Sequence, residues 1–155
     1  MHEQEQLKSL IHTFLEGSTD RFPQLSEDSL TALYGLACKY YENGKYGEAA
    51  DFFKFLTYAN AFERKYWLAL GAANQMLKKY PEAIEYYSVA AVQDPKDPYV
   101  HLHAADCFLA LGQIDKARIA LDSAQKTAQL DQKHTDLLSH LTLIQKAWAN
   151  KEKVI

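Results

Sequence analysis

The chain repeats itself every thirty-four residues. The stretches GKYGEAADFF, KKYPEAIEYY and GQIDKARIAL begin at residues 44, 78 and 112 and share one pattern of small, large apolar and charged residues. Four columns of equivalent positions keep this register: Ala49, Ala83 and Ala117; Tyr46, Tyr80 and Ile114; Phe53, Tyr87 and Leu121; Leu36, Leu70 and Ala104. A constant period of this length arises when copies of one supersecondary unit stack on each other.

The residue types at these positions are those of the tetratricopeptide repeat, a pair of antiparallel helices. The middle copy shows the pattern most completely, with Trp67, Leu70, Gly71, Tyr80, Ala83, Tyr87, Ala90 and Pro95. Small residues are needed where helices cross closely, and large residues fill the space between neighbouring repeats. The sequence therefore predicts an all-α solenoid of three helix pairs, at residues 30–63, 64–97 and 98–131, in a single domain that spans 1–155.

The turns carry residues that end and begin helices. ENGKY and ALGQI offer a glycine to end the first helix of a pair, and KKYPE places Pro81 at the start of the next helix, where its missing N–H costs little. Pro95 and Pro98 cannot continue a helix, so they close the second repeat.

Stacked repeats leave an apolar face at each end that must be covered. Segment 1–29 offers a helix with an apolar stripe, followed by a loop that ends at Ser26, a predicted N-cap. The stripe consists of Leu7, Leu10, Ile11, Phe14 and Leu15. Segment 132–155 offers a capping helix with a seam of Leu137, Leu141, Ile144 and Trp148. The N-terminal stripe either covers its own solenoid or packs on a second copy, which would make a homodimer through this helix.

Composition narrows the classes of partner. The net charge of -3 and the lack of a Lys/Arg cluster argue against nucleic acid. No apolar run approaches the ~20 residues of a membrane span, and the N-terminus has acids and glutamines where a signal peptide needs a basic start. Cys38 and Cys107 form neither a CxxC pair nor a disulfide framework. We expect a cytoplasmic protein with reduced thiols, no nucleic acid partner and no stable membrane insertion.

In such a solenoid the first helix of each repeat lines the concave face, where residues spaced i, i+4 and i+7 opposite the packing columns share one stripe. The predicted groove lining is Tyr34, Cys38, Tyr41 and Glu42 in the first repeat, Lys65, Leu68, Ala72 and Gln75 in the second, and Tyr99, Leu102 and Asp106 in the third. This largely apolar lining suits an extended peptide with apolar anchors. The other interpretation is that some of these residues pack against an N-terminal helix that folds back.

The sequence offers little for catalysis. His101 and His103 point in different directions on a helix, and His134 and His140 have no carboxylate at ligand spacing. No phosphate-binding glycine loop, serine elbow or metal signature is present. We therefore expect a binding protein that is not an enzyme and needs no cofactor and no metal.

One class of tetratricopeptide groove is excluded. Co-chaperones that bind the acidic C-termini of heat-shock proteins use Lys, Asn and Arg on the first helices. Here the corresponding positions hold Tyr34, Cys38, Ala69, Tyr99 and His103. The carboxylate clamp is absent.

Residues 10 to 130 contain four more specific stretches: FLEGST before the first repeat, LYGLACKYYENGKY, FFKFLTY followed by YWLALGA, and HAADCFLALG in the third repeat. In these stretches the chain resembles the class II chaperones of bacterial type III secretion, which serve the translocator proteins.

The resemblance implies a cytosolic, often dimeric chaperone that keeps two apolar pore-forming translocators unassembled before export. Such chaperones hold an extended client segment of the form PxLxxP in the concave groove. The groove aromatics of the family fall on Tyr34 and Tyr41, with Tyr46 from the Gly-Lys-Tyr turn. Cys38 stands where the family has a groove aromatic, and this departure leaves the size of that pocket open. A structural scaffold subunit of a larger assembly is the alternative function.

The repeat register can be tested at Ala83. If this column marks close helix crossings, Ala83→Leu overpacks one of them and lowers the free energy of unfolding by about 1–3 kcal/mol. Urea denaturation measures the loss. An unchanged midpoint would show that the register is wrong.

Overall fold

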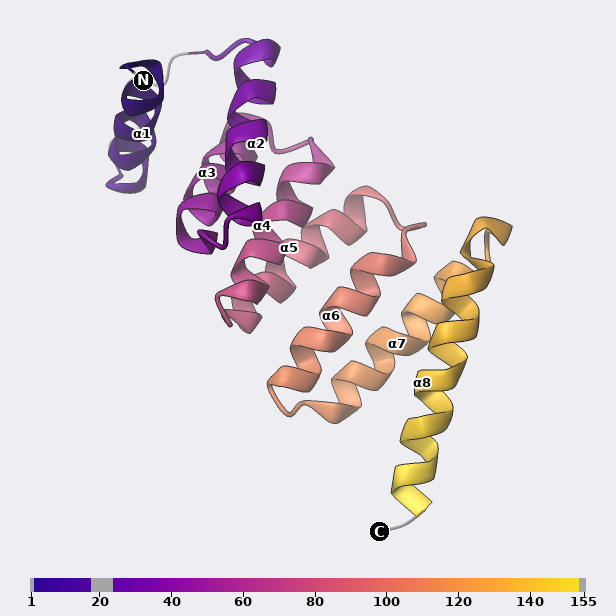
Figure 1. Ribbon diagram of the computed structural model, residues 1–155. Coiled ribbons are helices and arrows are strands. Elements are labelled where there is room, and N and C mark those ends of the chain that lie inside the picture. Colours follow the sequence, from indigo (N-terminus) through magenta and orange to yellow (C-terminus); the bar gives the residue numbers. More distant parts are fainter. Residues whose placement is uncertain (1, 18–23, 154–155) are drawn as a thin grey trace. The chain divides into compact units, whose positions relative to one another are not determined.

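The computed structural model describes residues 2–17 and 24–153, and in these ranges all regular structure is helical (Figure 1). The elements are α1 (His2–Leu15), α2 (Glu27–Glu42), α3 (Tyr46–Ala59), α4 (Arg64–Met76), α5 (Tyr80–Gln93), α6 (Pro98–Ala110), α7 (Ile114–Ala128), the 3-10 helix η1 (Gln132–His134) and α8 (Thr135–Lys153). The predicted all-α fold is confirmed. The loop predicted after the first helix falls partly on residues 18–23, outside the described residues.

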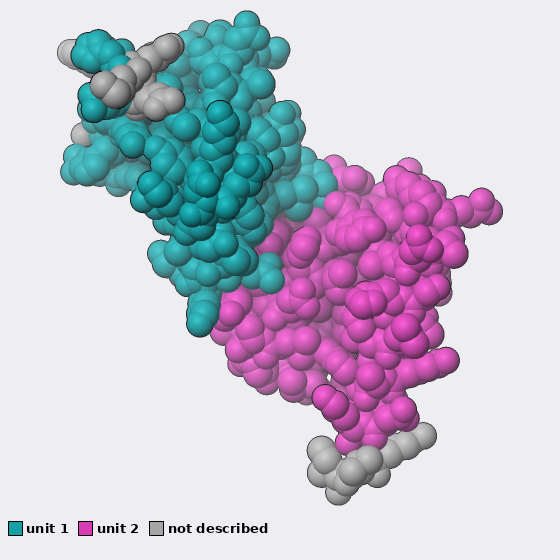
Figure 2. All heavy atoms as spheres, viewed as in Figure 1, with its two compact units in different colours: residues 1–79 teal, residues 80–155 magenta. Residues whose placement is uncertain are grey.

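The chain forms two compact units, residues 1–79 and residues 80–155 (Figure 2). The first holds α1 to α4 and the second holds α5 to α8, so the boundary falls in the turn after α4. The assignment of 1–155 to a single domain with the stated repeat boundaries stays a prediction.

The first unit is built on buried side chains from α2, α3 and α4. Leu33, Phe53, Phe55, Leu56 and Leu70 are at most 1% exposed, and Ala49 of the small-residue column is fully buried. Helix α1 packs on α3, which covers one face of this core.

The contact between α1 and α3 is aromatic and aliphatic. Ile11 is buried, and the ring centroid of Phe14 lies 5.5 Å from that of Phe55 and 4.7 Å from that of Tyr58. The predicted N-terminal helix therefore packs on its own chain through part of its apolar stripe.

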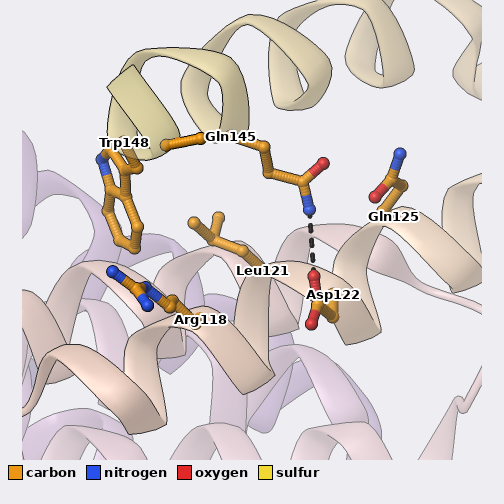
Figure 3. Close-up of a pocket in the computed structure, with 7 residues that line it drawn as sticks. Arg118, Leu121, Asp122, Gln125, Gln145 and Trp148 are labelled. Atoms are coloured by element: carbon orange, nitrogen blue, oxygen red, sulfur yellow. Dashed lines mark hydrogen bonds between the residues drawn. The ribbon is translucent and has the colours of Figure 1, made fainter. Parts of the chain in front are cut away.

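The second unit has its core between α6, α7 and α8. Leu137 and Leu141 of α8 are buried with Ala105, Leu121 and Ala124, and Ile144 and Trp148 pack against the same cluster. Gln145 of α8 also donates a hydrogen bond to Asp122 of α7, 3.1 Å long (Figure 3). The seam predicted on the final helix is confirmed as the face that covers α7.

Capping side chains fix several helix starts. Ser26 accepts a hydrogen bond from the backbone N–H of Ser29, as predicted for an N-cap. Asp97 caps α6 in the same way through the N–H of Tyr99, with Pro98 as the first helical residue.

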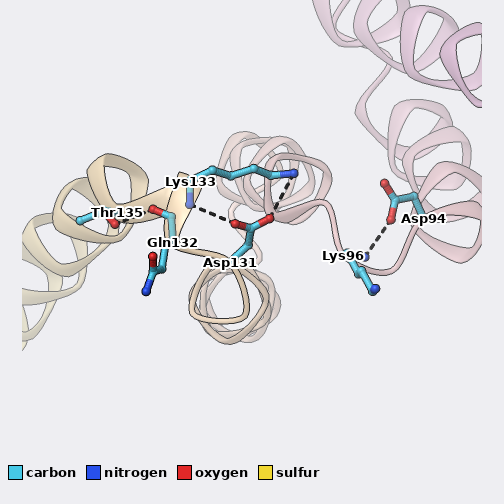
Figure 4. A network of polar contacts seen from close by, with 6 residues as sticks. All are labelled: Asp94, Lys96, Asp131, Gln132, Lys133 and Thr135. Carbon is cyan, nitrogen blue, oxygen red and sulfur yellow. Dashed lines mark hydrogen bonds and ion pairs between the residues drawn. The ribbon is translucent and has the colours of Figure 1, made fainter.

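The turns at Asp94 and Asp131 are held by local hydrogen bonds, in which the aspartate side chain accepts from a backbone N–H two residues further along the chain (Figure 4). Asp94 accepts from the N–H of Lys96, and Asp131 accepts from the N–H of Lys133 while its carboxylate pairs with the Lys133 ammonium at 3.3 Å. These bonds satisfy the carboxylates locally and hold the turns in shape.

Three helices end in the same left-handed turn, thirty-four residues apart. Gly44, Lys78 and Gly112 have φ of 75°, 60° and 71°. At each turn the next residue donates its N–H to a carbonyl five residues back, as Lys45 does to Tyr40 at 2.9 Å and Lys79 does to Asn74 at 2.9 Å. This is the Schellman arrangement, which favours glycine at the left-handed position. The middle repeat therefore places a lysine where its neighbours place glycine.

In the part of the chain that the structure describes, no helix has the length and apolarity needed to cross a membrane.

We expect Lys78→Gly to stabilise the protein. The left-handed conformation costs a residue with a Cβ about 1–2 kcal/mol, and this strain is relieved in the glycine variant. Glycine loses more conformational entropy on folding, which cancels roughly 0.5–1 kcal/mol of that gain. The net gain is about 0.5–1 kcal/mol, measured by urea denaturation.

The matched control is Gly112→Ala, at a turn where an added Cβ meets no atom within 4 Å. It should lose about 1 kcal/mol through backbone strain alone. A loss of stability in Lys78→Gly would contradict the equivalence of the three turns.

Candidate functional site

A pocket of about 230 Å³ opens in the first unit between α2 and α4. It is lined by Tyr34, Cys38, Tyr41 and Glu42 of α2, Phe53 of α3, and Ala69 and Ala72 of α4. Five of the residues predicted to line the groove are thus brought around one pocket. Their role in binding stays a prediction.

The pocket follows from helix geometry and side-chain size. Tyr34, Cys38 and Tyr41 stand at i, i+4 and i+7 on α2, so they share one face of the helix. Cys38 stands between the two tyrosines and is partly exposed. Together with Ala69 and Ala72 on α4 it supplies small side chains that leave the space open.

Aromatic rings form the walls. The Tyr34 ring centroid lies 5.8 Å from that of Phe53 and 5.5 Å from that of Tyr66. At the other end Tyr41 meets Tyr46 edge-on at 5.1 Å, where Tyr46 is the first residue of α3. Such pairs hold each other in place, so the walls are preformed.

The phenols of the pocket are neutral. Burial raises the pKa of Tyr34 to about 12, and the neighbouring Cys38 adds to this shift. Burial also raises the pKa of Tyr41, with a smaller contribution from Tyr46. Both side chains therefore keep their hydroxyl protons at neutral pH, and each can donate a hydrogen bond to a backbone carbonyl.

The four residues of α4 that were predicted to line the groove lie in three different environments. Ala72 lines the pocket. Lys65 is exposed and extends its ammonium over the rings of Tyr34 and Tyr66, 5.1 Å and 5.7 Å from their centroids. Leu68 and Gln75 are partly buried and lie outside the pocket lining.

The three predicted residues of α6 belong to the second unit. Tyr99 is 46% exposed, and its ring meets that of His134 edge-on at 5.8 Å. Leu102 packs against the core cluster of this unit. Asp106 is exposed; desolvation by its neighbours raises the pKa of its carboxyl, and His103 opposes this shift.

Sequence reasoning missed two lining residues, Phe53 and Ala69. Phe53 belongs to a repeat column and was assigned to packing alone, yet its 1% exposed ring also borders the pocket. Ala69 stands one turn before Ala72 in ALGA, and its spacing of three residues was the available signal.

Other cavities lie in the second unit. One of about 330 Å³ lies between α7 and α8, where Arg118 and Trp148 face each other near the Gln145–Asp122 hydrogen bond (Figure 3). Another of about 330 Å³ is lined mainly by apolar residues of α5, α6 and α7. Within residues 2–17 and 24–153, no group of three or more His, Cys, Asp or Glu side chains is arranged to hold a metal ion.

Comparison with known proteins agrees with the repeat assignment. Two tetratricopeptide-repeat family models match residues 34–98 and 76–141. The low calcium response locus protein H of Yersinia pestis is 35% identical over 118 residues, which cover 75% of this chain and 70% of that protein.

Solved structures show the same fold. PcrH of Pseudomonas aeruginosa, in complex with the chaperone binding region of PopD, superimposes with a TM-score of 0.76 at 34% identity and covers 83% of this chain and 96% of its own. The type III secretion chaperone SycD of Yersinia enterocolitica, in complex with a peptide of the translocator YopD, has a TM-score of 0.75 at 33% identity and covers 82% and 97%.

Proposed function

The chain belongs to the family of type III secretion translocator chaperones, and from this premise we propose that its groove binds an extended apolar segment of translocator proteins. Binding keeps these pore-forming clients unassembled in the bacterial cytoplasm before export. The single observation that carries the proposal is the preformed pocket between Tyr34 and Tyr41, with Cys38, Ala69 and Ala72 between α2 and α4. The complexes of PcrH and SycD with translocator segments support the assignment of the client class.

The pocket suits an extended segment for two reasons. Its aromatic walls and small side chains accept one apolar anchor, and an extended chain presents such anchors on alternate residues. Its neutral tyrosine hydroxyls can bond the backbone carbonyls that an extended segment leaves unpaired. The site thus binds a stretch of client that would otherwise be free to assemble.

The other predicted groove residues stay proposed client contacts. These are Tyr46, Lys65, Leu68 and Gln75 in the first unit and Tyr99, Leu102 and Asp106 in the second. No catalytic role is proposed for any of them, because the proposed activity is binding alone.

A structural subunit of a larger assembly is the second candidate function, since a tetratricopeptide surface serves permanent contacts equally well. Co-expression separates the two. A chaperone raises the solubility of its apolar client and is left behind on export, whereas a subunit stays with its assembly.

The groove proposal predicts the effect of truncating its aromatic walls. Tyr34→Ala and Tyr41→Ala each remove contact area worth ~1.5–3 kcal/mol when an aromatic side chain is buried. Affinity for a labelled PxLxxP peptide should therefore fall about tenfold to a hundredfold per site. Fluorescence anisotropy measures the affinity, and circular dichroism verifies that each variant is folded.

Tyr86→Ala is the matched control, because Tyr86 lies on α5 and does not line the pocket. It should bind the peptide nearly as well as the unmodified protein. Equal affinity of both groove variants and the unmodified protein would eliminate the pocket as the client site.

We further propose a homodimer through the edge of α1. Leu15, at the end of α1, is 39% exposed, and Tyr58, which contacts Phe14, is 54% exposed. These side chains leave an apolar edge beside the α1–α3 contact, which a second copy would cover.

Light scattering tests this proposal. The unmodified protein should have twice the 17.7 kDa mass of one chain, and Leu15→Lys should return it to the mass of one chain with helicity retained. A single-chain mass for the unmodified protein would leave α1 as an intramolecular cap only.

A further inference from the structure

Two opposite charges flank the part of α2 that lines the pocket, a carboxylate in the lining itself and an ammonium outside it at the other end. Lys65 lies over the Tyr34 ring, and Glu42 lines the pocket beside Tyr41. We propose that these two charges select a client segment with an acidic residue, an apolar anchor two positions away and a basic residue two positions beyond the anchor. This inference rests on the proposed function and adds the charge pattern of its client.

The placement of both charges works against helix stability. Glu42 is the last residue of α2, where the partial negative charge of the helix end repels a carboxylate. Lys65 is the second residue of α4, where the positive helix end repels an ammonium and no acidic residue stands in the first turn. Residues that violate such local rules are expected at functional sites.

Neither charge is paired within the part of the chain that the structure describes. Lys65 and Glu42 form no ion pair with another described residue. The Lys65 ammonium lies over the rings of Tyr34 and Tyr66, and the side chain is exposed, so a carboxylate can approach it from the solvent side. Both charges are therefore available to a bound segment.

One charged residue near each end of the pocket weakens the electrostatic field of Lys65 or Glu42. Glu63, the N-cap of α4, contributes in a minor way to the raised pKa values of Tyr34 and Tyr66, so it lies close enough to weaken the positive end. Lys39 stands in the last turn of α2, three residues before Glu42. On a helix three residues apart are neighbours, so Lys39 partly offsets the negative end.

The distance between the ends sets the spacing in the client. Tyr34, which marks the Lys65 end, and Glu42 are eight residues apart on α2, or about 12 Å along the helix axis at ~1.5 Å per residue. An extended segment rises ~3.3 Å per residue, so residues i and i+4 are about 13 Å apart and share a face with residue i+2. One apolar anchor in the pocket thus falls midway between two opposite charges.

Probe peptides can be built on one PxLxxP sequence. In this motif only the last proline has a variable residue both two positions before it and two positions after it, so this proline serves as the apolar anchor. The first varied position is therefore the residue directly after the leucine, and the second is the residue two positions after the last proline. Three peptides carry Asp and Lys, Asp and Asp, or Lys and Lys at these positions. The Asp/Lys peptide satisfies both ends of the pocket in only one direction of the bound chain; for the opposite direction the Lys/Asp peptide takes its place in every comparison below.

The unmodified full-length protein should bind the Asp/Lys peptide about threefold to tenfold more tightly than either like-charged peptide at low salt, since exposed charge pairs are individually weak. The difference should shrink at 0.5 M salt, where the Debye length is only ~4 Å. Lys65→Glu should then favour the Lys/Lys peptide, and Glu42→Lys the Asp/Asp peptide. Both variants should melt close to the unmodified protein, because each reversal suits its helix end but places a like charge beside Lys39 or Glu63.

Two controls change the net charge equally on another element. Lys54→Glu and Glu48→Lys lie on α3 outside the pocket lining and should keep the preference for the Asp/Lys peptide. Glu63→Gln should increase it. Affinities that simply follow the net charge of the peptide, or preferences that do not switch in Lys65→Glu and Glu42→Lys, would overturn the proposal.

Tyr34→Ala separates this inference from the proposed function. If it weakens all three peptides while no charge preference exists, the groove function stands and only the charge pattern is wrong. If it weakens none of them, the pocket is not the client site and both proposals fail.

Discussion

Close helix crossings at one column of alanines are the constraint on which the structure depends. Ala49, Ala83 and Ala117 are all fully buried. A side chain without a γ atom lets two helix backbones approach, and this approach lets the neighbouring large residues interdigitate. In the first unit the resulting packing holds α2 and α4 in place with Phe53 of α3 between them, which forms the pocket. The functional surface is thus a consequence of the same contacts that stabilise the fold.

The sequence predicted the elements well because their determinants are local and repeated. The thirty-four-residue columns fixed the helix pairs, and Ser26, Gly44, Gly112 and Pro81 stand at helix ends as expected. The left-handed turn at Lys78 was hidden, because lysine gives no signal of positive φ. Only its position midway between Gly44 and Gly112 in the register could have revealed it.

The site was predicted in part. Helical spacing identified Tyr34, Cys38 and Tyr41 as one stripe, since residues on one helix face are set by the chain itself. Phe53 and Ala69 were missed because a pocket depends on how different helices meet, and a residue of the packing column can serve both the core and a surface. The pattern also could not decide which face of α1 would pack on α3, as both partners are apolar along several residues.

The central claim is that an extended client segment occupies the pocket that contains Cys38. The two cysteines of the chain offer a direct measurement, because Cys38 is partly exposed in the pocket while Cys107 is buried and has a pKa raised to about 11 by that burial. The rate of alkylation of Cys38 should be followed by mass spectrometry with and without a saturating PxLxxP peptide, with Cys107 as the unreactive internal reference. The account predicts that the bound peptide slows alkylation of Cys38 severalfold. An unchanged rate at a peptide concentration shown to saturate the protein would contradict it.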